Sequence, residues 1–341
     1  MAPLRIVSLL PSATEILFAL GLDEQIVGVS HECDFPPAAC SKKVVIHSRI
    51  PKDASPAEID RLVREFSARG ESVYSVDAQA LRSLSPDLIV TQDLCHVCAA
   101  SPEDLAVVLS DFDQRPEVLC LNPLDLGDVW RDILWVGEET FRPHAAEKLL
   151  ETIGEKLGAI ERQVQSTNDE RQVQSMNDEG QVQAMNDDRQ IQCTNDCPRV
   201  AFLEWLQPIY VGGHWIPEMI ERAGGRDVFA KPRSPSFRLS PDDVVAAQPD
   251  ILIVAPCGYT ANQARDEYRA MSFTAGWQDI PAVRTGRVYS LDANSYFSRP
   301  GPRLITGLEI LAKLIHPSVE VSQEAESAIM PINLARHAAS F

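Results

Sequence analysis

Side chains suited to binding chemistry occur in five short groups of this sequence, each placed just after a predicted strand. The groups are residues 30–34, 91–98, 212–215, 256–259 and 292–303. They contain imidazoles, thiols, aromatic rings and guanidinium groups, which suit a metal, a flat ligand or an anion. Because open α/β sheets bind ligands at the carboxyl ends of their strands, we expect the five groups to line one ligand cleft between two lobes.

The thiols leave three interpretations open. Cys95 and Cys98 form a CxxC pair, which suits a metal site, a redox pair or two reduced thiols at a strand end. A structural zinc site needs four ligands, so one CxxC pair requires others. The further ligands available in the groups are Cys33, Cys257, His31, His96 and His214.

The other binding residues suit a flat, polar ligand. An imidazole can bind a metal centre or a polar ligand edge, and aromatic rings can stack on a planar one. Arg299 and Arg303 are able to bind a carboxylate or phosphate through two hydrogen bonds, or alternatively to cap the last helix. The predicted ligand contacts are His31, Glu32, Trp205, His214, Trp215, Tyr296, Phe297 and Arg299, with packing as the alternative for Trp215.

Two α/β segments must position these groups. The first 120 residues alternate short β-branched runs with helical patterns, as a parallel sheet with covering helices does. Strands are predicted over residues 6–9, 27–29, 44–46, 88–91 and 117–121, and then over 201–203, 251–254 and 287–289. A Pro-Asp pair leads into an apolar strand in both segments, at Pro86 and Pro249. We therefore predict the α/β class, with two Rossmann-like lobes joined by a long rigid helix.

The predicted domain organisation has five parts. Helices over residues 128–139 and 143–160 connect the lobes, and Pro143 suits a helical first turn. A nine-residue repeat follows, reading QVQSTNDER, QVQSMNDEG, QVQAMNDDR and QIQCTNDCP from Gln163. Its apolar residues fall on alternating faces of a helix or strand, so we expect a solvated insertion without a shared core. The parts are residues 1–126 (first lobe), 127–161 (connecting helices), 162–197 (insertion), 198–316 (second lobe) and 317–341 (tail).

Composition and charge exclude several functional classes. The 341 residues include 31 Lys and Arg against 49 Asp and Glu, for a net charge of −18, which argues against nucleic acid as a partner. The sequence contains no run of about 18 apolar residues, which is the length that would indicate a membrane-spanning helix, so we do not expect membrane insertion. The sequence lacks the Walker, G-x-S-x-G and H-E-x-x-H patterns, so we expect a binding protein and not an enzyme.

The start of the sequence bears on its location. A predicted strand begins at Ile6, which leaves no room for a removable secretory leader after Met1. We therefore expect a cytoplasmic protein with reduced thiols. A gene start placed too late would instead make the protein periplasmic or otherwise extracytoplasmic.

Several motifs together resemble a known family. They are IVSLLPSATEILFAL at residues 6–20, DFPP at 34–37, the two Pro-Asp strands and residues 298–303. This set resembles the cobalamin and iron-siderophore substrate-binding proteins of ABC importers, which have the class III periplasmic-binding-protein fold, and most of all their vitamin B12-binder branch. The resemblance covers the chain except for the repeats and the tail. It implies a corrinoid or similar chelate bound between the lobes, with no required cofactor.

The resemblance also implies roles for individual residues. Family members pair an exposed Glu of each lobe with arginines of an ABC permease, and Gln79 and Asp242 occupy those positions here. Aromatic residues flank the corrin in the vitamin B12 binder, at positions held here by Glu32, Trp205 and Tyr296. The leading hypothesis is non-catalytic binding of a cobalamin-like chelate, as an importer component or an intracellular carrier. The alternative is a cytosolic metal- or thiol-dependent protein on the same scaffold, working through Cys33, Cys95, Cys98 and Cys257.

Overall fold

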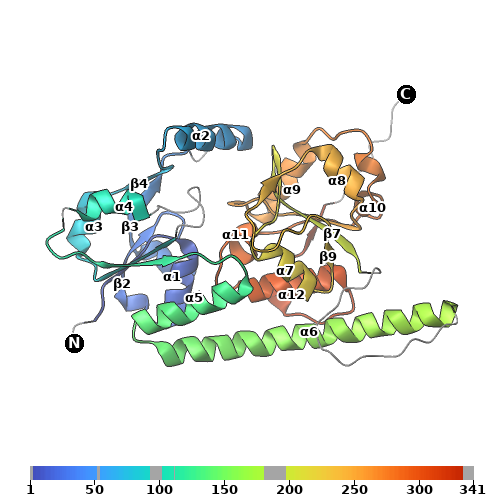
Figure 1. The fold of residues 1–341 in the computed structure, drawn as a ribbon, viewed down its shortest axis with the longest axis horizontal. Helices are drawn as coiled ribbons and strands as arrows, with labels where there is room; N and C mark the ends of the chain where they lie inside the picture. The colour runs from blue at the N-terminus through green and yellow to red at the C-terminus, as the bar shows by residue number, and fades with distance from the viewer. Residues whose placement is uncertain (1–2, 52–53, 93–101, 111, 180–196, 333–341) are drawn as a thin grey trace. The chain divides into compact units, whose positions relative to one another are not determined.

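The computed structural model describes residues 3–51, 54–92, 102–110, 112–179 and 197–332. The chain divides into two compact units. Unit 1 comprises Met1–Thr152 with Pro300–Pro302, and unit 2 comprises Ile153–Arg299 with Arg303–Phe341. Each unit has its own sheet, which confirms the two predicted α/β lobes (Figure 1).

Unit 1 is built on a six-stranded sheet with the order β4-β3-β2-β1-β5-β6. All neighbours are parallel except β3 and β4. The strand order reverses between β1 and β5, and ligand crevices of doubly wound sheets form at such a switch point. The strands are β1 (Ile6–Ser8), β2 (Ile26–Ser30), β3 (Lys43–Ser48), β4 (Tyr74–Val76), β5 (Leu88–Gln92) and β6 (Glu117–Leu121).

Helices cover both faces of this sheet. The face that carries Val7 and Ile89 packs into one apolar core with Phe66, Leu81 and Leu105. These three residues belong to α2 (Pro56–Ala68), α3 (Ala78–Leu84) and α4 (Pro102–Leu109). The opposite face is covered by α1 (Pro11–Ala19) and α5 (Leu126–Glu139) (Figure 1). Two 3-10 helices, η1 (Asp23–Gln25) and η2 (Pro37–Ser41), flank β2.

Unit 2 has a mixed sheet with the order β10-β8-β7-β11-β12-β13, and β9 pairs with β7. The central strands β7, β11 and β12 are parallel, whereas β8, β10 and β13 run antiparallel to their neighbours. The strands are β7 (Arg199–Leu206), β8 (Ile209–Val211), β9 (Arg226–Asp227), β10 (Phe237–Arg238), β11 (Ile251–Val254), β12 (Val288–Ser290) and β13 (Met330–Pro331).

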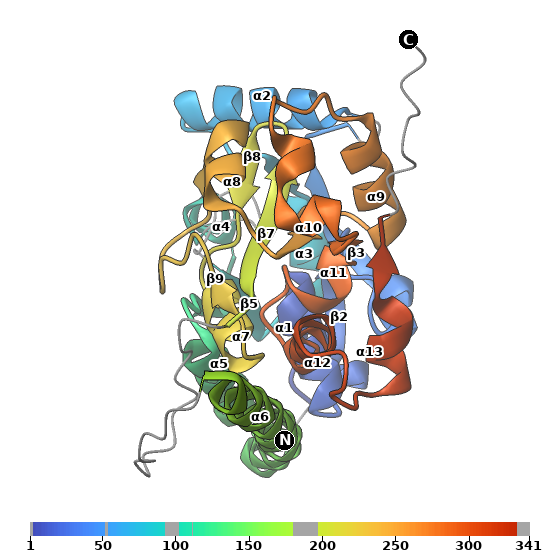
Figure 2. The ribbon, with the colours of Figure 1, turned by 90° about the vertical axis from the view of Figure 1, so that its right-hand side faces the viewer.

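The helices of unit 2 also form two layers. α8 (Pro241–Ala247), α9 (Ala261–Ala270) and α10 (Pro281–Arg284) pack on one face, around the fully buried Tyr268 and Trp277. α7 (Ile216–Arg222) and α12 (Leu304–Ile315) lie together on the other face (Figure 2). The remaining helices are η3 (Trp277–Asp279), α11 (Ala293–Tyr296) and α13 (Gln323–Ala328).

The two Pro-Asp motifs fold into the same turn. The residue before each proline has a positive φ, of 40° in unit 1 and 47° in unit 2. Asp87 Oδ2 then accepts a hydrogen bond of 2.8 Å from the backbone N–H of Arg5, and Asp250 Oδ2 accepts one of 2.9 Å from that of Arg199. Asp87, just before β5, thus fixes the start of the neighbouring strand β1, and Asp250, just before β11, fixes the start of β7.

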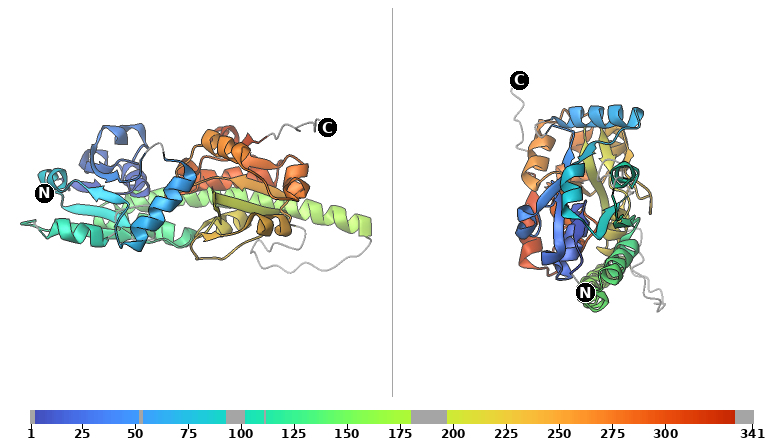
Figure 3. Two further views of the ribbon diagram at one scale, coloured as in Figure 1. Left: turned by 90° about the horizontal axis from the view of Figure 1, so that it is seen from above. Right: turned by 90° about the vertical axis from the view of Figure 1, so that its left-hand side faces the viewer.

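The connecting helix is longer than the sequence predicts. α6 (Pro143–Glu179) continues beyond residue 160 through the first repeat copy, as one uninterrupted rod (Figure 3). Val164 of that copy is fully buried, and its Cγ1 lies 2.5 Å from where a Cβ on Gly224 would be. Gln163 exchanges two hydrogen bonds with the backbone of Glu320, at 3.2 and 2.8 Å. The expectation of a solvated repeat is therefore wrong at Gln163 and Val164, which α6 packs onto the rest of unit 2, whereas the next two residues are exposed.

The prediction that residues 317–341 form a separate tail is also wrong as far as residue 332. α13 packs on α12, and β13 pairs with β12 as the last strand of the sheet. Ile332 is 2% exposed and belongs to the unit 2 core. A two-residue strand has no periodicity to recognise, so this edge of the sheet is not predictable from local sequence patterns.

The packing of Val164 yields a testable prediction. Truncation of a buried valine loses apolar burial and leaves a cavity, so Val164→Ala should lower the free energy of unfolding by roughly 1–3 kcal/mol. Val107, which is 76% exposed on α4, provides the control, and Val107→Ala should change stability by less than about 0.5 kcal/mol. Urea denaturation of both variants measures the difference. Equal stabilities would show that the first repeat copy contributes no core contact.

The buried carboxyl group of Asp227 should make the free energy of unfolding depend on pH. Its side chain is 9% exposed, Oδ1 accepts the Phe229 N–H at 2.8 Å, and burial raises its pKa to about 6, with nearby Glu221 adding to the shift. A carboxyl pKa raised above the unfolded value makes folding less favourable as pH rises through the interval between the two values. Asp227→Asn keeps the acceptor, so its stability relative to wild type should grow by roughly 1–3 kcal/mol as pH rises from 4 to 7. Denaturation at several pH values tests this, and a pH-independent difference would contradict it.

Candidate ligand-binding site

Two of the three predicted groups of unit 2, at residues 256–259 and 292–303, follow the parallel strands β11 and β12 at their carboxyl ends. The third group, at residues 212–215, follows β8, which runs antiparallel to β7, so its prediction at the same sheet edge is wrong. Trp205 is near the end of β7, where a register shift against β8 forms a bulge. Its ring is half-buried, and its Nε1–H donates to the Gln207 carbonyl at 3.2 Å. Tyr259, in the loop after β11, meets this ring edge-on with 5.7 Å between the ring centres. These two strand ends therefore carry an ordered aromatic pair.

A third aromatic residue follows β12. Tyr296 ends α11, is half-buried, and donates its hydroxyl to Glu324 Oε1 at 3.1 Å. Burial, together with the Glu324 carboxylate, raises the pKa of Tyr296 to about 12, so its phenol stays neutral at physiological pH. Arg299 is half-buried three residues further on. The loop thus offers a neutral ring and a cation, which suits a ligand with an apolar face and a polar edge.

Two of the predicted contacts are instead core residues. Trp215 is 5% exposed and Phe297 is 2% exposed. The Trp215 Nε1–H donates to the Phe297 carbonyl at 2.8 Å, and the Phe297 ring packs 5.2 Å from that of Phe202. Both side chains therefore stabilise the α7 and α12 layer of unit 2, and their prediction as ligand contacts is wrong.

His214 lies in a tightly closed turn after β8. Its φ is 52°, and its backbone N–H donates to the Ser234 carbonyl at 2.7 Å. Nε2 is buried without a hydrogen-bond partner among the described residues, and burial lowers the pKa of the imidazole. Glu204 braces the same turn, since its Oε2 accepts from Ser236 Oγ at 2.6 Å and from the Gly213 N–H at 3.3 Å. His214 is therefore a neutral, inward-facing residue whose ligand role stays a prediction.

In unit 1, the group after β2 is split between surface and core. His31 Nδ1 lies 3.2 Å from the Ile46 carbonyl oxygen, and the side chain of Glu32 is 46% exposed. Cys33 is 4% exposed, and its Sγ lies 3.0 Å from Thr14 Oγ1. His31 and Glu32 remain predicted ligand contacts. Cys33 is wrong as a metal ligand here because its thiol is enclosed beneath α1.

The other thiols give no support to a metal centre. Within the described ranges, no three His, Cys, Asp or Glu side chains are grouped as metal ligands. Cys95, His96 and Cys98 fall outside those ranges. Cys257 is a half-buried free thiol after β11, whereas Cys197 is disulfide-bonded, which corrects the expectation that all thiols are reduced.

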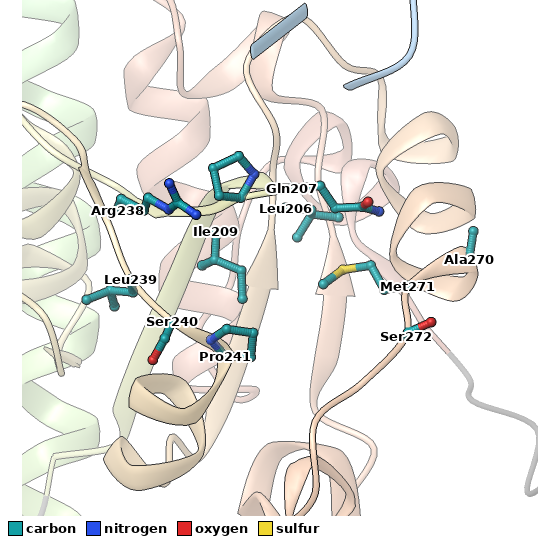
Figure 4. A pocket seen from close by; sticks show the side chains of 11 residues that line it. Leu206, Gln207, Ile209, Arg238, Leu239, Ser240, Pro241, Ala270, Met271 and Ser272 are labelled. Carbon is teal, nitrogen blue, oxygen red and sulfur yellow. The ribbon is translucent and has the colours of Figure 1, made fainter. Parts of the chain in front are cut away.

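The two predicted docking positions are both on the surface. Gln79 is exposed on α3, and Asp242 is exposed on α8, where its Oδ1 accepts from Thr274 Oγ1 at 2.7 Å. Beside Asp242, unit 2 contains an open pocket of about 680 Å³ that the sequence does not reveal (Figure 4). None of the predicted ligand contacts lines it; its walls include Leu206, Ile209, Arg238, Pro241 and Met271.

The fold defines a class of binding proteins with two Rossmann-like lobes. The chain belongs to the periplasmic binding protein family, whose model matches residues 6–295. This confirms the resemblance drawn from the motifs.

Individual relatives share the family over most of their length. The chain is 24% identical to an uncharacterized ABC transporter substrate-binding lipoprotein, YvrC, of Bacillus subtilis, covering 92% of this chain and 81% of the relative. It is 21% identical to a vitamin B12-binding protein of Vibrio parahaemolyticus, covering 89% and 86%.

Solved structures give the same fold. A periplasmic heme binding protein from Pseudomonas aeruginosa superposes with a TM-score of 0.68 at 18% identity, covering 97% of this chain and 98% of the other. The vitamin B12 binding protein BtuF of Vibrio cholerae gives 0.61 at 22% identity, covering 91% and 96%. Across the described ranges, no helix has both the length and the apolar character needed to cross a membrane.

Proposed function

We propose that this protein binds a cobalamin-like or related metal chelate without catalysis, as the substrate-binding component of an ABC importer. The observation that carries the proposal is the set of half-buried aromatic residues at strand carboxyl ends of unit 2, Trp205, Tyr259 and Tyr296. Relatives named as vitamin B12-binding and heme-binding proteins support this class of ligand.

The chemistry of these residues suits a large, flat ligand. Binding energy for such a ligand comes mainly from burying its apolar faces, while a few polar groups fix its orientation. Trp205 and Tyr296 supply apolar faces, and Arg299 a charged donor. We propose that His31 and Glu32 contribute from the β2 end of unit 1.

We also propose that the protein acts outside the cytoplasm, in place of the cytoplasmic location expected from the sequence. The relatives named as periplasmic proteins or lipoproteins support this, as does the disulfide at Cys197, because disulfides persist in oxidising compartments. Cell fractionation should recover the mature chain outside the cytosol. Recovery in the cytosol with Cys197 reduced would contradict the proposed location.

An importer component needs a permease partner. We propose that Asp242 on α8 is one of the docking residues, because it is an exposed carboxylate that can pair with a permease arginine. Gln79 is exposed but uncharged, so unit 1 would dock through hydrogen bonds at this position.

Titration of the purified protein with cyanocobalamin, haem and a ferric siderophore tests the function. The proposal expects saturable absorbance changes at one ligand per chain for at least one of them. Stoichiometric zinc or iron in the purified protein, without binding of any chelate, would instead favour the metal- or thiol-dependent alternative.

A further inference from the structure

A surface pocket of unit 2 lies outside the set of predicted chelate contacts. Three segments surround it, namely the β7–β8 hairpin at residues 206–209, the connection from β10 to α8 at 238–241, and the end of α9 with the residues after it at 270–272 (Figure 4). Its volume of about 680 Å³ falls within the range of about 300–1,000 Å³ that is typical of small-molecule sites. The pocket is therefore large enough to hold a small organic ligand.

The floor of this pocket is apolar. Leu206 and Ile209 are each 2% exposed, and Leu239 and Met271 are half-buried. In Figure 4 the Met271 side chain extends toward Ile209 from the opposite wall. These side chains present an apolar surface that a ligand can cover, and burial of apolar surface favours binding.

Backbone hydrogen bonds fix all three walls of the pocket. The Leu239 N–H donates to the Ile209 carbonyl at 3.0 Å, which joins two of the walls. Ser240 starts α8 with a capping box, and the Met271 N–H donates to the Tyr268 carbonyl at 3.3 Å at the end of α9. The pocket is thus preformed, and a preformed site lowers the cost of binding because the ligand does not have to order it.

The charge of the pocket comes from Arg238 on its rim. None of the other lining residues that the structure describes is ionisable. Arg238 is exposed, and no carboxylate in the described ranges forms an ion pair with it. The pocket therefore carries a positive charge in a protein whose net charge is −18. A guanidinium group of this kind can bind a carboxylate through charge-assisted hydrogen bonds.

The acidic residues that follow the pocket in sequence are bonded to their own chain. Asp242 Oδ1 accepts from Thr274 Oγ1 at 2.7 Å. Asp243 Oδ2 accepts from the N–H and the hydroxyl of Ser240 at 2.8 and 2.7 Å. Neither carboxylate lines the pocket, so Arg238 stays available to an anionic ligand.

We propose that this pocket binds an organic monocarboxylate with an apolar body. The carboxylate pairs with Arg238 on the rim, and the apolar body covers Ile209 and Met271. An inorganic anion would leave the floor exposed to water, and a neutral apolar molecule would leave Arg238 unpaired, so an amphipathic anion fits both features. The site does not depend on chelate binding, because no predicted chelate contact lines it.

Titration of the full-length protein with octanoate at neutral pH, followed by ligand-observed NMR, tests this site. Octanoate should bind saturably. Hexanoate should bind about fourfold to tenfold more weakly, because it buries two fewer methylene groups. Octanamide, which keeps the chain but not the charge, should bind about threefold to tenfold more weakly. Equal affinity for acetate and octanoate would show an adventitious ion only and would overturn the proposal.

Two variants locate the binding. Arg238→Gln removes the charge, so its affinity for octanoate should fall about threefold to tenfold and match its affinity for octanamide. Ser272→Trp places a large side chain on the rim, so it should weaken the binding of octanoate and octanamide together. Arg284→Gln is the matched control, because Arg284 is an exposed arginine of α10 outside the pocket, and it should leave octanoate affinity unchanged.

Urea denaturation of each variant separates loss of the site from loss of the fold. Arg238 and Ser272 are both exposed, so their substitutions should leave stability close to that of wild type. Absence of saturable octanoate binding in wild type, or equal affinity in wild type, Arg238→Gln and Ser272→Trp, would overturn the proposal. If Ser272→Trp does not fold, the comparison of Arg238→Gln with Arg284→Gln decides it.

Discussion

Trp205→Ala and Tyr296→Ala should each weaken chelate binding by about tenfold, and together by about 100-fold. Each aromatic side chain contributes buried apolar area, and its ring contact adds roughly 0.5–1.5 kcal/mol beyond that area. The two residues follow different strands, β7 and β12, so their losses should add. Calorimetric titration of the variants with the ligand that wild type binds measures both effects.

The control for this prediction is Trp135, which is 41% exposed on α5 of unit 1 and whose Nε1–H donates to Glu139. Trp135 lies outside all of the predicted ligand groups in the sequence. Trp135→Ala therefore removes a tryptophan side chain without removing a predicted ligand contact, so affinity should not change. Equal loss in Trp135→Ala and Trp205→Ala, or no loss in either site variant, would contradict the role of the strand-end aromatics.

Gly213→Ala should destabilise the protein by more than about 3 kcal/mol. A Cβ at this position would lie 2.3 Å from the Ser236 backbone N and 2.7 Å from the Ser234 carbonyl oxygen. These are backbone atoms, so no side-chain rotation can relieve the overlap, and the turn that Glu204 braces must open. Strain of this kind belongs to the small set of changes with very large effects on stability.

Gly154 offers a matched comparison for this substitution. It lies inside α6, and nothing is within 4 Å of the position that a Cβ would take there. Gly154→Ala should therefore raise the free energy of unfolding by up to about 1 kcal/mol, because alanine is the better helix former. Chemical denaturation distinguishes the two, and a loss below about 1 kcal/mol for Gly213→Ala would show that residues 234–236 move aside easily.

Much of the fold follows from short-range signals in the sequence. Residues 117–121 and 251–254 are strands as predicted, and residues 78–84 and 241–247 are helices as predicted. The two helices begin after Asp77 and Ser240, whose side chains each accept a hydrogen bond from the backbone N–H three residues further on, so these start signals are local. The short strands β8, β10 and β13 are not predicted because two or three residues carry no period. In addition, β10 and β13 pair with strands that are distant in the chain.

The site is predicted less completely than the fold. The sequence places Trp205 and Tyr296 at strand ends, and the structure finds them there, half-buried. It does not reveal which side chains of a loop turn inward, so it predicts Trp215 and Phe297 as ligand contacts although both complete the unit 2 core. Tyr259 is not predicted because its ring contact with Trp205 joins the loop after β11 to the end of β7, and only the folded sheet brings the two together.

Amide hydrogen exchange, compared with and without bound chelate, tests the central claim most directly. If the ligand binds at strand carboxyl ends, it should slow exchange in the loops over residues 205–208, 256–260 and 292–299, and in residues 30–34 of unit 1. Exchange at the opposite strand ends, including the Pro-Asp turns at residues 85–87 and 248–250, should stay the same. Protection confined to those turns, or to the helices away from the strand-end loops, would contradict the proposed site.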